Sequence, residues 1–280
     1  MVLLSASNAS PEEEQEPWQT KVISLADGIR HICANEEFYD VIFNVRGHKF
    51  KGHRLILAAM SPKFKNMLLK PDSPSEFHDS SSIIGFQILW RFIYTDELGT
   101  TKQNEILEAY RVAKAFEQSQ LVEKCEEVIG SMEISVENVS SMLNQVPDID
   151  LLRERCLQFI SLNNVDVLNS ADFLKATPNT LQDIFRHNCL ADVPILTLQS
   201  NILRWGCNQF PEMEDYKLVR DLLMNIRVLG KLKIHKLKAE DLAELTIQYP
   251  ELLTSKEYQK FNVHVFRPDY PLPEWCDLND

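Results

Sequence analysis

The chain has 280 residues, 44% of them hydrophobic, which is typical of a globular protein long enough for about two domains. Its 41 acidic residues outnumber 29 basic ones, and the formal net charge of −12 argues against nucleic acid and anionic membranes as partners. Only eight residues are glycine, and they form no phosphate-binding G-x-G-x-x-G motif. Because sandwiches and propellers need glycine in their turns, this shortage favours a mostly helical fold.

The termini and the cysteines indicate a cytoplasmic protein, with the nucleus as an additional compartment. The longest apolar run, residues 55–60, is far shorter than the roughly 18 residues of a membrane span. The amino terminus becomes polar after residues 2–4 and acidic at residues 12–14, unlike a secretory signal. The six cysteines are scattered without a C-x-x-C pair, as free thiols usually are.

The first segments of the chain differ sharply in composition. Residues 1–17 are rich in Ser, Glu and Pro and are expected to form a disordered acidic tail. A helix is predicted from Trp18 to near Glu37, because apolar residues recur there at intervals of three and four. The positions of this apolar stripe are Val22, Leu25, Ile29, Ile32 and Cys33.

Strands are predicted in one short region only. Residues 40–45 and 48–51 are expected to pair as a hairpin, because the two-residue link Arg46-Gly47 contains a glycine. A further short strand is expected at residues 76–78. Helices are predicted at residues 54–60, at 63–69 after the cap Ser61-Pro62, at 86–94, at 104–117, and from the cap Ser119 through Ile129. The helix at 86–94 is apolar on nearly all sides and is expected to be buried.

The second half of the sequence predicts helices only. Capping residues or prolines open helices at 136–146, 149–162, 171–175, 179–187 and 195–210, the fourth of them after the cap Thr177-Pro178. Further helices are expected at 216–226 and 239–249. After Pro250 the aromatic and proline content favours extended chain. We therefore expect domains at residues 18–130 and 131–250, followed by a C-terminal extension at 251–280.

No pattern in the sequence is typical of catalysis or metal binding. The seven histidines form no H-E-x-x-H motif, and His187 with Cys189 has no second pair at zinc-finger spacing. No G-x-S-x-G motif marks a nucleophilic serine. We therefore expect no enzyme activity, cofactor, metal or small-molecule substrate. The basic segment at 231–238 is interpreted as an amphipathic stretch with solvated lysines, with a nuclear-import or nucleic-acid patch as the alternative.

Several stretches resemble the BTB/POZ domain and the BACK domain that often follows it. The BTB-like stretches are Asp40-Val41, Gly47–Phe50, Gly52–Arg54, Leu57-Ala58, Ser61-Pro62 with Phe64 and Met67, Phe92–Glu97 and Ala113–Cys125. The BACK-like stretches are Cys156–Ile160, Phe173-Leu174, Leu203–Trp205 and Ile226–Val228. Trp18-Gln19 and Tyr94–Glu97 are most similar to the BTB-domain-containing protein 6 branch. The resemblance covers about residues 18–250 and implies an α+β BTB/POZ domain, with helices around a small sheet, followed by an all-α BACK domain.

The resemblance also implies a dimer formed through the first helix, with a second copy of the chain or with another BTB protein. The residues that it assigns to the dimer interface are Val22, Leu25, Ile29, Ile32, Asp40 and Arg54. Asp40 and Arg54 are further expected to form a charged pair near that interface.

BTB-BACK proteins commonly act as substrate adaptors of cullin-3 ubiquitin ligases, and the resemblance implies the same noncatalytic role here. The candidate cullin-docking residues are Lys63, Met67, Pro74, Glu76 and Phe77. Pro74-Ser75-Glu76 keeps the acid of the family's apolar-x-Glu motif but has proline where a larger apolar residue is expected. The sequence shows no kelch repeats and no PHR domain, so the alternative is a dimerisation module that pairs with or regulates other BTB-BACK proteins without binding cullin. DNA-bound regulators with BTB domains carry zinc fingers, and this sequence has none.

Overall fold

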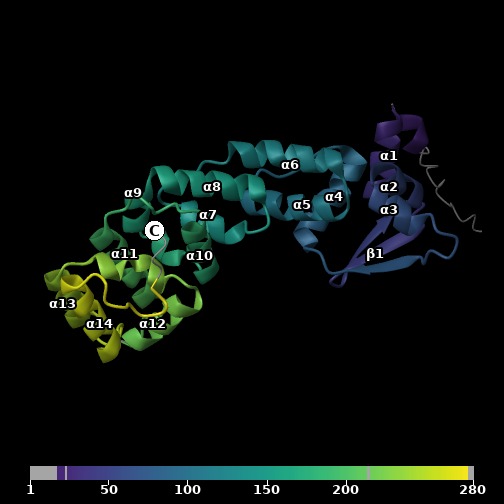
Figure 1. Cartoon of the computed structure of the whole chain (residues 1–280). Helices are drawn as coiled ribbons and strands as arrows, with labels where there is room; N and C mark the ends of the chain where they lie inside the picture. The colour runs from purple at the N-terminus through teal and green to yellow at the C-terminus, as the bar shows by residue number, and fades with distance from the viewer. Residues whose placement is uncertain (1–17, 23, 213–214, 277–280) are drawn as a thin grey trace, which may run out of the picture. The chain divides into compact units, whose positions relative to one another are not determined.

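The chain forms two compact units in the computed structural model, which describes residues 18–22, 24–212 and 215–276 (Figure 1). The first unit ends at Ile129 and the second begins at Gly130. The predicted acidic tail at 1–17 lies outside the described residues, and the finer domain limits at 18, 130 and 250 stay predictions. Within the described ranges, no helix has the length and apolar character needed to cross a bilayer.

A three-stranded sheet in the order β2-β1-β3 forms the β part of the first unit. The strands are β1 (Val41–Val45), β2 (His48–Gly52) and β3 (Glu76–Asp79). β1 pairs with β2 in antiparallel and with β3 in parallel orientation, so Phe43 lies between Phe50 and Phe77. Alternate residues of β1 are buried, as expected of a strand with one face in the core.

The hairpin predicted between β1 and β2 is confirmed, and its turn explains the choice of residues. Arg46 has φ 49° and Gly47 has φ 93°, the left-handed values that a two-residue type I′ turn requires. Gly47 adopts this conformation without a steric cost, whereas Arg46 adopts it at a steric cost because it has a Cβ atom. The Nε of Arg46 donates a hydrogen bond to the carbonyl of Ser80 at 2.8 Å, which offsets part of that cost.

Helices surround this sheet in the first unit. They are η1 (Trp18–Lys21, a 3-10 turn), α1 (Leu25–Ala34), α2 (Arg54–Met60), α3 (Pro62–Leu68), α4 (Ile83–Thr95), α5 (Gln103–Ala115) and α6 (Ser119–Ser131). The predicted burial of the apolar helix near residues 86–94 is confirmed, because eight residues of α4 are buried. Phe86 and Trp90 of α4 form an aromatic cluster with Phe43 of the sheet. α4 packs closely against α5, and together with the sheet it forms the core.

At two helix starts the capping differs from the sequence-based prediction. The single helix expected from Trp18 is divided, because Ser24 caps a new helix by accepting a hydrogen bond from the amide of Asp27 at 3.1 Å. α6 is capped by the side chain of Gln118 rather than by Ser119. The Oε1 of Gln118 accepts the amides of Gln120 and Leu121, and Ser119 becomes the first residue of the helix.

The described residues of the second unit form helices and no strand, so the prediction of an α+β fold followed by an all-α region is confirmed. The α-helices are α7 (Val139–Gln145), α8 (Asp150–Leu162), α9 (Asn164–Asn169), α10 (Pro178–Arg186), α11 (Ile195–Asn208), α12 (Tyr216–Asn225), α13 (Ala239–Gln248) and α14 (Ser255–Phe266). Short 3-10 turns lie at η2 (Phe173–Lys175), η3 (Leu229–Leu232) and η4 (Ile234–Lys236). Trp205 of α11 is fully buried, and its Nε1 donates to the carbonyl of Ala176 at 2.8 Å.

The prediction of extended chain after Pro250 is wrong for residues 255–266, which form α14. The start of this helix has a capping box, in which Thr254 accepts the amide of Glu257 and the Glu257 carboxylate accepts the amide of Thr254. Phe261 is buried and lies 5.7 Å from the ring of Trp275. Residues 251–276 are therefore packed into the second unit as a helix and a short following segment.

Candidate functional site

The first candidate surface is α1, whose apolar stripe remains accessible. No residue of α1 is buried, and Leu25 is 81% exposed. Ile29 and Ile32 are half-buried, and α1 packs on α4. Val22 is also half-buried, and it lies close enough to Gly28 that a Cβ there would be 3.6 Å from its Cγ1. An amphipathic helix that buries none of its residues within the unit can bury its apolar side against a partner.

Further large apolar side chains are exposed in the same unit. Leu55 on α2 is 78% exposed, and Phe38 in the segment after α1 is 72% exposed. Exposed apolar side chains of this size are often found at protein–protein contacts when they are contiguous.

Asp40 and Arg54 lie together, but their contact uses backbone atoms instead of the expected pairing of charged groups. The Oδ1 of Asp40 accepts the amide of Arg54 at 2.8 Å, and the Nε of Arg54 donates to the carbonyl of Asp40 at 3.4 Å. Arg54 is the first residue of α2, and the preceding His53 provides no side-chain cap. Asp40 therefore satisfies one free amide at the start of α2 from outside the helix.

The guanidinium of Arg54 instead ties α2 to the loop that leads into β3. Its Nη1 donates to the carbonyl of Leu68 and to the Oγ of Ser73, both at 2.8 Å. Its Nη2 donates to the carbonyls of Ser73 and Pro74. Several charge-assisted bonds from one side chain hold this loop in a defined conformation.

Three of the five predicted cullin-docking residues line one surface pocket. Met67, Pro74 and Phe77 belong to a pocket of about 460 Å³ formed by the end of α3, the following loop and β3. The Oγ of Ser73 donates to the carbonyl of Met67 at 3.0 Å, which joins the loop to the end of α3 at this pocket. The ring of Phe77 stacks on Phe43 at 5.1 Å, so the floor of the pocket is continuous with the buried core.

The other two predicted docking residues lie outside this pocket. Glu76 precedes Phe77 in β3 and therefore points to the opposite face of the strand. Its Oε1 accepts the Nδ2 of Asn44 at 3.3 Å and lies 3.7 Å from the Nζ of Lys49. The ammonium group of Lys63 lies 5.3 Å from the ring centroid of Phe116.

Several titratable side chains are buried and take part in the packing and hydrogen bonding of the fold. Burial raises the pKa of the Cys125 and Cys156 thiols to about 12, which keeps both protonated at neutral pH. His53 is buried and bonded to Tyr94 and to the backbone of Glu37. Over the described ranges, no group of three or more His, Cys, Asp and Glu side chains is placed to hold a metal ion.

One contact between a cysteine and a histidine was not foreseen from the sequence. The Sγ of Cys276 lies 3.5 Å from the Nδ1 of His235. No local pattern could have indicated it, because 41 residues separate the two side chains.

Comparison with known proteins identifies the domain type of the first unit. The family model described as the BTB/POZ domain matches residues 30–133, which include the sheet, Arg54 and the pocket at Met67. BTB/POZ domain-containing protein 9 of Drosophila melanogaster is 24% identical over 225 residues, which are 75% of this chain and 31% of that protein. Kelch-like protein 6 of Homo sapiens is 26% identical over 190 residues, which are 65% of this chain and 30% of that protein. A solved structure, the BTB domain of zebrafish PATZ1, is similar with a TM-score of 0.34 at 24% identity over 38% of this chain and 87% of that chain.

The chain spans about a third of the length of these two curated relatives. The helical second unit is consistent with a BACK-like region. The similarity to the protein 6 branch stays a prediction.

Proposed function

Because residues 30–133 form a BTB/POZ domain, a noncatalytic interaction module, we propose that this chain is a noncatalytic homodimeric scaffold that serves as a substrate adaptor of a cullin-3 ubiquitin ligase. The similarity to BTB/POZ and Kelch-like proteins supports a role in protein interaction. A cytoplasmic location is part of the proposal and is supported by six cysteines that are all free thiols.

The observation that carries the docking proposal is the pocket at Met67, Pro74 and Phe77. The pocket is preformed, because Arg54 is hydrogen-bonded to the loop at Ser73 and Pro74 and because Phe43 stacks on the ring of Phe77. A preorganised apolar pocket loses little conformational entropy on binding and suits an apolar anchor side chain of a partner. We assign cullin-3 docking to this pocket, with Met67 on its α3 side.

A charge placed in the pocket should weaken docking strongly, whereas the same charge beside the pocket should not. We expect Met67→Asp to weaken binding of the cullin-3 amino-terminal region by about tenfold or more, because a carboxylate would be desolvated at the contact. Asn66→Asp is the matched control, since Asn66 is the preceding, exposed residue of α3 and does not line the pocket. Calorimetric titration measures both affinities. Absence of cullin binding, or an equal loss in both variants, would contradict the docking assignment.

The dimer is expected to depend on the exposed face of α1. We expect the chain to have about twice its 32.4 kDa mass in light scattering at micromolar concentration, and Leu25→Glu to shift it towards the monomer. Leu162→Glu is the control, because Leu162 is similarly exposed, at 77%, but lies in α8 of the second unit. A monomeric wild-type chain would refute the homodimer.

The alternative function is a dimerisation module that pairs with other BTB-BACK proteins without binding cullin. The position of Glu76 favours it, because its carboxylate is bonded to Asn44 and Lys49 and does not reach the pocket. Affinity purification followed by mass spectrometry separates the two functions. Recovery of BTB-BACK relatives without any cullin would support the alternative, and recovery of cullin-3 would support the adaptor.

A further inference from the structure

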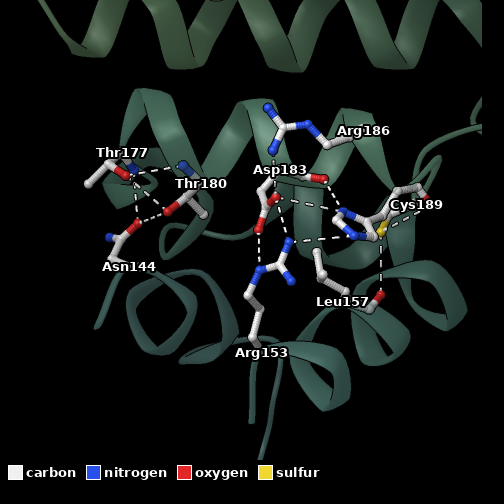
Figure 2. A network of polar contacts seen from close by, with 9 residues as sticks. Asn144, Arg153, Leu157, Thr177, Thr180, Asp183, Arg186 and Cys189 are labelled. Carbon is white, nitrogen blue, oxygen red and sulfur yellow. Dashed lines mark hydrogen bonds and ion pairs between the residues drawn. The ribbon is translucent and has the colours of Figure 1, made fainter. Parts of the chain in front are cut away.

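A second pocket lies wholly within the second unit and has a different chemical character. It has a volume of about 480 Å³ and is enclosed by α7, the start of α8 and α10. Most of its lining residues are polar or charged, and several of them are labelled in Figure 2. The lining side chains used below are Asn144, Arg153, Thr177, Thr180, Asp183 and Arg186.

One end of this pocket is fixed by hydrogen bonds between α7 and the start of α10. The Oδ1 of Asn144 accepts the amide of Thr177 at 2.9 Å and the hydroxyl of Thr180 at 2.6 Å (Figure 2). Its Nδ2 donates to the carbonyl of Lys175 at 2.8 Å. These bonds use both polar atoms of the amide. Asn144 therefore holds the pocket open as a structural brace and has little capacity left for a ligand.

The other end is fixed by an ion pair between α8 and α10. The Nε and Nη2 of Arg153 donate to the two carboxylate oxygens of Asp183 at 2.6 and 2.8 Å. The side chains are only 19% and 15% exposed, and hydrogen bonds from Arg153 lower the pKa of Asp183, so both groups are charged at neutral pH. Two separate braces along α10 make the pocket preformed.

Positive charge exceeds negative charge in this pocket, although the chain as a whole is strongly acidic. Arg186 lies one turn beyond Asp183 on α10, with its Nη1 3.5 Å from Oδ1 of Asp183 and its side chain 64% exposed (Figure 2). Arg153 has a further amino group, Nη1, for which the described residues offer no hydrogen bond. Among the residues that line the pocket, the single carboxylate of Asp183 faces two guanidinium groups, which gives the lining a net charge of one positive unit. The hydrogen bonds to Asp183 raise the pKa of Arg153, and so do the charges of Asp150 and Glu154, which do not line the pocket. Nη1 of Arg153 and the guanidinium of Arg186 remain as donors for a ligand.

We propose that this pocket binds a carboxylate side chain from an acidic segment of a protein partner, with Arg186 and Nη1 of Arg153 as the donors. A guanidinium pairs with a carboxylate through parallel hydrogen bonds, and the low exposure of Arg153 strengthens such a bond. Asp183 sets the preference among anions. Its negative charge balances that of one arginine. The remaining net charge of one positive unit matches a monoanionic carboxylate better than a phosphate dianion. The site would give the second unit a recognition role that is independent of the docking pocket in the first unit.

The test measures binding of a fluorescein-labelled, glutamate-rich peptide to the full chain by fluorescence anisotropy at about 0.1 M salt. We expect saturable binding, and about tenfold weaker binding for Arg186→Gln, because one charge-assisted contact is lost. Lys217→Gln is the matched control. It removes the same charge from an exposed residue of α12 that does not line the pocket, so we expect a change of less than about twofold.

A second variant tests the role of the half-buried Arg153. Arg153→Lys retains a positive charge opposite Asp183 but loses the second guanidinium amino group, and it should also weaken peptide binding several-fold while circular dichroism stays unchanged. The proposal is overturned if the peptide does not bind saturably, if a glutamine-for-glutamate peptide binds equally well, or if Arg186→Gln and Lys217→Gln lose affinity equally. Tighter binding of a phosphoserine peptide than of the glutamate peptide would overturn the assigned preference for carboxylate. The cullin-3 titration is expected to be unaffected by Arg186→Gln, so the two proposals fail independently.

Discussion

Glutamine in place of Glu257 is expected to lower the free energy of unfolding of the second unit by about 3 kcal/mol at neutral pH. Glu257 lies in the first turn of α14, and its side chain is 13% exposed. Arg220 of α12 donates to both carboxylate oxygens at 2.8 Å, and the Nε1 of Trp275 donates to Oε1 at 2.6 Å. The carboxylate also accepts the amide and the hydroxyl of Thr254. One ionised group therefore joins α12, α14 and the chain at Trp275.

The size of the effect follows from the pKa of this carboxyl group. Burial alone would raise it, but hydrogen bonds from Arg220, Trp275 and Thr254 lower the pKa of Glu257 from 4.5 to about 2. A pKa that is lower in the folded than in the unfolded chain stabilises the folded state at every pH above the unfolded value. The difference between the two values corresponds to about 3 kcal/mol, which is lost as the pH falls from about 4.5 through 2.

Urea denaturation followed by tryptophan fluorescence measures this free energy at neutral and acidic pH. The difference between wild type and Glu257→Gln should shrink as the pH falls below about 4.5, since protonation removes the same charge from the wild type. Glu240→Gln is the control, because Glu240 is exposed on α13, and it should change stability by less than about 0.5 kcal/mol. An equal loss in both variants, or a difference that does not depend on pH, would contradict this account.

Features that depend on neighbouring residues were predictable from the sequence. The caps at Ser61 and Thr177 were placed correctly, since each accepts the amide three residues ahead. The burial of α4 was predictable as well, because its apolar residues are close together in the sequence and cover nearly all sides of the helix. The capping box of Thr254 and Glu257 was also readable, but the prolines and aromatic residues around it favoured extended chain instead. The structure follows the capping box, which starts α14.

Contacts between distant residues were not predictable in this way. Asp172 is buried, and its carboxylate accepts the amides of Ser140 and Ser141, so the start of α7 depends on a residue more than thirty positions later. The guanidinium of Arg54 reaches a loop that the sequence shows only as a polar break. The register of β3 against β1 decides that Phe77, and not Glu76, faces Phe43 and the core. Each of these contacts joins elements whose relative positions are set by the packed core.

Alanine in place of Gly85 is expected to lower the free energy of unfolding of the first unit by about 3 kcal/mol. Gly85 lies in the first turn of α4, where this helix packs against α5. A Cβ at this position would be 2.5 Å from the carbonyl oxygen of Glu108 and 2.7 Å from Cγ2 of Val112. The first of these atoms belongs to the backbone of α5 and cannot move aside by a rotamer change. The two helices would have to separate, and the aromatic core between α4 and the sheet would lose contacts with them.

The same substitution at Gly130 is expected to have the opposite sign. Gly130 lies in α6, and a Cβ built there would meet no heavy atom within 4 Å. Without a clash, alanine should raise stability by about 0.5–1 kcal/mol, because it reduces the conformational freedom of the unfolded chain and favours the helix. Thermal and urea unfolding of both variants measure the two changes. If Gly85→Ala were neutral or stabilising like Gly130→Ala, the close approach of α4 and α5 could not be what requires glycine at position 85.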